Sequence, residues 1–243
     1  MDEVTAESAV LWCESIEEQL VSFIKKIPPI GANMNTWSPV LASIIVDACG
    51  LMDSIFRYFA PQSYVTKKGI SKDRDRLSLH DFADMYCSEF GLHEQKIILL
   101  TTPPVYKAPF SDWLKMMQGG DFATPNWWGT YNNFKHSRLE YLQEAKLETA
   151  ICALAGLILT ITSFKKEFAH AMIRRGWIDI KGWVPDVAIE MLKNERNPEE
   201  FVVETTLFVV VLGKMKLPEK VEDIAPALHG GSKKLAVHIG KWS

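Results

Sequence analysis

The sequence lacks most of the short motifs that identify a reaction. It has no glycine-rich phosphate loop, no Gly-x-Ser-x-Gly nucleophile turn and no His-x-x-x-His pair. The four cysteines stand far apart in the chain, at Cys13, Cys49, Cys87 and Cys152. We therefore expect reduced core cysteines rather than a disulfide framework, with no metal site and no cofactor.

An excess of charge of one sign and a long apolar run are missing as well. The net charge of −3 over 243 residues excludes a generally basic nucleic-acid coat, although a local basic patch stays possible. The most apolar run, from Thr149 to Phe164, has about 16 residues where a membrane-spanning helix needs about 20. The acidic N-terminus lacks the pattern of a signal peptide. These features predict a cytoplasmic protein that does not associate with membranes.

Over most of its first 176 residues, the sequence has apolar side chains at helical spacing. The expected helices run from Thr5 to Lys26, from Pro39 to just before Pro61 with Ser38 as N-cap, from a capping box at Ser78 to Gly91, and from Thr124 to about Arg175 with a break near Ser137 to Glu140. The sequence thus predicts an all-α fold in a single domain over residues 1–243. A helical bundle forms its core, over about 5–176, and a less regular C-terminal extension covers about 177–243.

The C-terminal extension gives weaker signals. A helix is favoured for Phe201 to Lys214, because Asn197-Pro198 followed by two glutamates is typical of a helix start. The valines and threonines of the same stretch would also suit a strand. A short strand is expected over Lys234 to Trp242, and Lys96 to Thr101 is either a short strand or an extra turn.

The most distinctive stretch is polar and runs from Trp127 to Arg138. On a helix, Asn132 and His136 lie one turn apart on one face, and Lys135 lies beside them. The stretch thus offers a neutral amide, a titratable imidazole and two cations along one strip.

Such a strip is suited to a phosphorylated ligand. Lys135 and Arg138 can hold a phosphate, and Trp128 or Tyr131, which lie along the adjoining row, can stack a base. In this interpretation His136 is available as an acid or base, with Asn132 as its polar neighbour.

A structural interpretation of the same residues stays open. Lys135 and Arg138 can be solvated cations, and His136 can pair with Glu140 one turn later. Asn132 can fasten the proline-rich loop that precedes it. The protein is then a non-catalytic protein-interaction or scaffold domain, in which the stretch only anchors a loop.

A family resemblance is carried by the residues that follow. They are Pro109-Phe110, Trp113, Trp127-Trp128, Tyr131-Asn132, Lys135-His136 and Arg138, followed by an alanine-rich apolar helix. Over about Leu79 to Phe164, this arrangement resembles a group of uncharacterised bacterial helical proteins. More loosely, it is similar to the HEPN superfamily, the higher eukaryotes and prokaryotes nucleotide-binding domains.

The resemblance implies an up-and-down helical core that binds RNA or a nucleotide and pairs as a homodimer, with the two copies of His136 facing a shared groove. Many HEPN members are metal-independent RNases that place an arginine shortly before a histidine. His136 matches that histidine, but the arginine positions hold Gly129, Thr130 and Tyr131, and Asn132 is the polar residue left to act as its partner. The resemblance therefore implies binding, and leaves open whether the protein is an enzyme.

Overall fold

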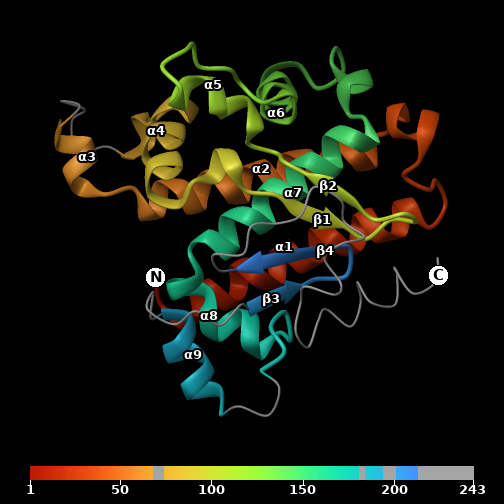
Figure 1. Cartoon of the computed structure of the whole chain (residues 1–243). Helices are drawn as coiled ribbons and strands as arrows, with labels where there is room; N and C mark the ends of the chain where they lie inside the picture. Colours follow the sequence, from red (N-terminus) through yellow and green to blue (C-terminus); the bar gives the residue numbers. More distant parts are fainter. Residues whose placement is uncertain (68–73, 181–183, 194–200, 213–243) are drawn as a thin grey trace. The chain divides into compact units, whose positions relative to one another are not determined.

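The computed structural model of the chain describes residues 1–67, 74–180, 184–193 and 201–212 (Figure 1). Helices dominate these residues, which confirms the expected helical content, and a small antiparallel sheet is also present, so the fold is mostly helical rather than all-α. Contacts within the chain divide it into two compact units. The first comprises residues 1–26, 96–107 and the described residues from 161 on, and the second comprises residues 27–95 and 108–160.

The helices and strands fall into these two units. The first unit contains α1 (Glu3–Ile24), β1 (Ile97–Leu99), β2 (Val105–Lys107), α8 (Lys165–Arg174), α9 (Pro185–Lys193), β3 (Phe201–Glu204) and β4 (Phe208–Leu212). The second contains the short 3-10 helices η1 (Gly31–Asn35), η2 (Arg74–Arg76), η3 (Leu92–Glu94), η4 (Ser111–Trp113) and η5 (Leu142–Glu144), and the α-helices α2 (Pro39–Phe59), α3 (Gln62–Lys67), α4 (Leu79–Phe90), α5 (Leu114–Met117) and α6 (Asn126–Ser137). Helix α7 (Leu147–Ser163) belongs to the second unit up to residue 160.

Helices α2 and α4 begin and end where the sequence predicts. The Ser38 side chain accepts a hydrogen bond from the backbone N–H of Leu41 and caps α2. At α4, Ser78 and Asp81 form the expected reciprocal capping box, and Gly91 ends the helix with a φ of 65°. These local signals are confirmed because each acts within one helical turn.

Helix α2 is the longest apolar helix of the second unit. Among the described residues it is the one helix whose length and composition would suffice to cross a membrane, whereas α7 and α8 meet that test only as a pair bent by 106°. Half of the apolar window of α2 is buried inside the protein. Partial burial of this kind is also what the core helix of a soluble protein shows, so the helix is consistent with a soluble protein.

The sheet lies in the first unit, with the strand order β2-β1-β4-β3 and antiparallel pairing throughout. Strands β3 and β4 lie where a helix was predicted, so that prediction was wrong. Their valines pair across the hairpin, as in Val203 with Val210, and β4 pairs in turn with β1 at Ile98. Strand pairing in the sheet thus determines the structure of this segment in spite of its local helix-start pattern. Strand β1 confirms the strand alternative for Lys96 to Thr101. The strand predicted for Lys234 to Trp242 lies outside the described residues.

A buried carboxylate on α1 holds the turn between β3 and β4. Glu17 is only 4% exposed. Its carboxylate accepts hydrogen bonds from the Thr205 hydroxyl, from the backbone N–H of Thr206 at 3.1 Å and from that of Leu207 at 2.8 Å. A buried charge is tolerated when its oxygens are paired in this way, and the turn in return gains acceptors for its backbone N–H groups.

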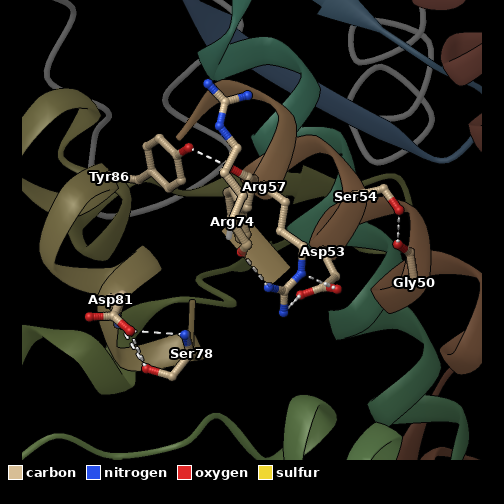
Figure 2. A network of polar contacts seen from close by, with 9 residues as sticks. Gly50, Asp53, Ser54, Arg57, Arg74, Ser78, Asp81 and Tyr86 are labelled. Carbon is tan, nitrogen blue, oxygen red and sulfur yellow. Dashed lines mark hydrogen bonds and ion pairs between the residues drawn. The ribbon is translucent and has the colours of Figure 1, made fainter. Parts of the chain in front are cut away.

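A polar network in the second unit joins α2, η2 and α4 (Figure 2). The Arg57 guanidinium donates to the Asp53 carboxylate at 2.9 and 3.1 Å and to the backbone carbonyl of Arg74 at 2.8 Å. Arg74 donates to the carbonyl of Tyr58, and the Tyr86 hydroxyl donates to that of Phe56. Since these donors find acceptors inside the network, we assign it a structural role.

The Glu17 contact leads to a stability prediction. Replacing Glu17 by Ala removes the acceptor of the backbone N–H groups of Thr206 and Leu207 and one hydrogen bond of the Thr205 hydroxyl, and we expect a loss of about 3 kcal/mol in the free energy of unfolding. Glu18→Ala is the matched control, because Glu18 is the next residue on the same helix and is exposed. We expect that change to stay within about 0.5 kcal/mol of the wild type in urea denaturation. Equal losses for the two variants would contradict the role assigned to Glu17.

Candidate functional site

Helix α6 carries the distinctive stretch, and one of its faces is buried and aromatic. Trp127, Trp128, Tyr131 and Phe134 are all buried. The rings meet edge to face, with centroids 5.6 Å apart for Trp127 and Trp128 and 5.4 Å apart for Trp128 and Tyr131. This face packs the helix against α2.

A glycine on α7 makes room for this packing. A Cβ atom at Gly156 would lie 3.1 Å from the Met52 Cε atom and 3.5 Å from ring atoms of both Phe110 and Trp127. The Trp127 indole N–H also donates to the carbonyl of Pro109 at 2.9 Å. Trp127 therefore fixes α6 and at the same time anchors the proline-rich loop before it.

The predicted site residues divide between the two faces of α6. Asn132, Lys135, His136 and Arg138 are exposed. Trp128 and Tyr131 are each only 4% exposed, which leaves little ring surface for a stacked base. The structure therefore brings the amide, the imidazole and the two cations to the surface, and places the two aromatic rings in the core.

Lys135 lies close to a buried ring of its own helix. Its Nζ atom is 4.2 Å from the centroid of the Tyr131 ring. Burial raises the pKa of Tyr131, and the neighbouring Lys135 offsets part of that rise. The lysine stem thus runs along the apolar face while the residue itself stays exposed.

Arg138 acts electrostatically on the polar edge of α2. Burial raises the pKa of Asp47, and the positive charge of Arg138 counteracts that effect. The charge of Asp53, also on α2, raises the pKa of Tyr131, but this carboxylate is paired with Arg57. The charge of Arg138 is therefore partly balanced by Asp47, and the surface is locally mixed rather than strongly basic.

Asn132 and His136 do not hold the preceding loop. Within the described ranges, neither side chain takes part in a hydrogen bond, an ion pair or a ring contact. The neighbouring Asn133, which the sequence did not single out, donates to the Glu144 carboxylate at 3.0 Å. The anchoring contacts of this region thus come from Trp127 and Asn133, and the two predicted polar residues face solvent.

Other features of the described residues offer no better site. A shallow hollow of about 440 Å³ is lined by Lys115, Gln118, Gly120, Asp121, Phe122 and Ala123, and includes none of the predicted residues. In the described part of the chain, no three His, Cys, Asp or Glu side chains gather as a metal site requires. The candidate site therefore consists of the exposed residues Asn132, Lys135 and His136 of α6 and its C-cap residue Arg138. We call these four residues the exposed half of α6.

In comparisons with protein-family models, curated proteins and solved structures, nothing matches this chain. The resemblance to HEPN domains therefore stands on the sequence motif alone.

The packing around Gly156 can be tested with a pair of glycine substitutions. Gly156→Val places a Cβ atom and two methyl groups against Met52, Phe110 and Trp127, and we expect it to lower the free energy of unfolding by about 2 kcal/mol. Gly129 also lies within a helix but has nothing near its missing Cβ, so Gly129→Ala should raise stability by about 0.5 to 1 kcal/mol. Urea denaturation measures both. A neutral Gly156→Val would show that α6 is not held in this way.

Proposed function

We propose that the exposed half of α6 binds the phosphates of RNA or of a nucleotide, through Lys135 and Arg138. The observation that carries the proposal is the exposure of both cations at the end of a helix whose other face is fixed in the core. A helix held in this way presents its polar residues in a constant arrangement, which lowers the entropic cost of binding. Arginine adds a planar, bidentate contact that suits a phosphate.

Asn132 and His136 complete the proposed surface. Both are exposed and without partners among the described residues, so their hydrogen-bonding groups are open to a ligand. An amide and an imidazole can contact a phosphate oxygen or a sugar hydroxyl. The carboxylate of Asp47 on the neighbouring helix limits the local positive potential near Arg138, so we propose weak binding that is sensitive to salt.

The proposal assigns binding and not cleavage. A general base is usually oriented by a third group, and His136 has no such partner among the described residues. The HEPN-like helical core and the homodimer, with two copies of His136 across a shared groove, belong to the same proposal. A second copy would double the cations available to one polyanion. The proposed setting is the cytoplasm.

One observation favours a second candidate, the non-catalytic protein-interaction domain. Leu139 follows Arg138 directly and is 92% exposed. Burying a large apolar side chain of this exposure in a contact with another protein would be favourable. Phosphate binding does not require Leu139, so a Leu139→Ser variant separates the two functions.

The phosphate proposal is tested by the salt dependence of binding to a fluorescein-labelled oligouridylate, measured by fluorescence anisotropy. We expect Lys135→Ala combined with Arg138→Ala to weaken binding and to reduce the slope of log affinity against log salt by about 1.4, at about 0.7 for each phosphate contact. Leu139→Ser should leave both quantities unchanged.

A matched control is available at the end of α1. Lys25 and Lys26 are also exposed, follow the last turn of a helix, and give the same change in net charge when replaced by Ala. We expect that double variant to bind like the wild type. Equal losses for the two double variants, or no binding by the wild type, would overturn the phosphate proposal.

A further inference from the structure

A short two-stranded contact lies in the second unit, at the end of the segment that follows α6. The backbone N–H of Leu147 donates to the carbonyl of Thr36 at 2.9 Å, and that of Ser38 donates to the carbonyl of Ala145 at 3.4 Å. These bonds make Trp37 and Lys146 an antiparallel bridge pair. The beginnings of α2 and α7 therefore lie side by side (Figure 1).

The bridge geometry directs both side chains to one face. The two hydrogen bonds flank the pair and do not join its members, so Trp37 and Lys146 form a pair of the non-hydrogen-bonded kind. In such pairs the Cα atoms are only about 4.5 Å apart and the side chains are at their closest. The indole of Trp37 and the amino group of Lys146 therefore project from the same side of the ribbon.

Both side chains are open to solvent. Trp37 is 45% exposed, in contrast to the buried Trp127 and Trp128, and Lys146 is exposed as well. Among the described residues, no ring contact involves Trp37 and no ion pair involves Lys146. The core thus does not use this indole, and its exposed surface is available to a ligand.

The pair is linked to the exposed half of α6. The connection from α6 begins with one further turn, in which the backbone N–H of Tyr141 donates to the carbonyl of Ser137 at 3.3 Å. Asn133 then holds Glu144, which stands two residues before Lys146. His136 is three residues after Asn133 and so lies one turn along the helix on the same side. The segment from Ser137 to Lys146 thus joins the end of α6, where the two cations lie, to Lys146 and its bridge partner Trp37.

We propose that Trp37 stacks a base of single-stranded RNA, with Lys146 on the adjacent phosphate, while the same strand continues to Lys135 and Arg138. This inference rests on the proposed phosphate binding and specifies its ligand. A single strand is required because only an unstacked base can lay its face on an aromatic ring. An exposed aromatic ring beside a row of cations is the combination by which proteins hold single strands. Trp37 takes the role that the sequence assigned to Trp128 or Tyr131.

The test compares tryptophan variants for binding to a labelled oligoadenylate. Trp37→Ala should weaken binding about tenfold, the effect of losing one base–aromatic stack. Trp37→Phe keeps an aromatic face and should retain most of the affinity. Trp12→Ala is the matched control, because Trp12 is 52% exposed on α1 of the other unit. That variant should bind like the wild type.

A base-free polyanion separates stacking from charge. Inorganic polyphosphate has no base to stack, so its affinity, measured by displacement of the labelled oligoadenylate, should be the same for the wild type and for Trp37→Ala. The slope of log affinity against log salt for Trp37→Ala should also stay at the wild-type value. Lys146→Ala should instead lower that slope by about 0.7. Thermal melting of each variant verifies that it is folded.

The outcomes distinguish the inference from the function on which it rests. If oligoadenylate binding depends on Lys135 and Arg138 but not on Trp37, the stacking inference is overturned and the phosphate proposal stands. If Trp37→Ala weakens the binding of polyphosphate and of oligoadenylate equally, the ring supports the fold or binds a different ligand. The inference is again overturned. A wild type that binds neither polyanion overturns both.

Discussion

The close packing of Met52, Phe110 and Trp127 around Gly156 determines where α6 lies. The glycine leaves room for this packing, because a Cβ atom there would lie 3.1 Å from the Met52 Cε atom and 3.5 Å from ring atoms of Phe110 and Trp127. Once Trp127 is seated, its indole N–H reaches the carbonyl of Pro109, and the preceding loop is fixed to the same helix. The other aromatic residues of α6 follow at helical spacing into the core, and the polar residues between them are left to the surface.

A different contact has the corresponding role in the first unit. The carboxylate of Glu17 is buried on α1 and is satisfied by the turn between β3 and β4, far away in the sequence. Helix α1 is also joined to the end of α8 by ion pairs from Arg174 and Arg175 to glutamates of α1. Exposed ion pairs of this kind add little to the free energy of unfolding. The buried carboxylate is therefore the contact that fixes the β3–β4 hairpin to α1.

What the sequence predicts well depends on interactions within one helical turn. Ser38, Ser78 and Gly91 mark helix ends because their caps are local, and the placement of Asn132 and His136 on one face of α6 follows from helical periodicity. The hairpin of β3 and β4 was missed because its pairing with β1 joins segments far apart in the chain. Burial of Trp128 and Tyr131 was missed for the same reason, since it depends on packing against α2. The pairing of Trp37 with Lys146 has no signal in the sequence, because neither segment has the length or the alternation of a strand.

The central claim is that a ligand strand contacts the exposed half of α6 and the ribbon beside it, while the aromatic half of the helix stays buried. The most direct measurement is photo-cross-linking of a 4-thiouridine-substituted oligonucleotide to the intact chain, with the attachment sites located by mass spectrometry. We expect cross-links on Trp37 and on the segment from Asn132 to Leu139. Cross-links confined to other parts of the chain, with these segments unmodified, would contradict it.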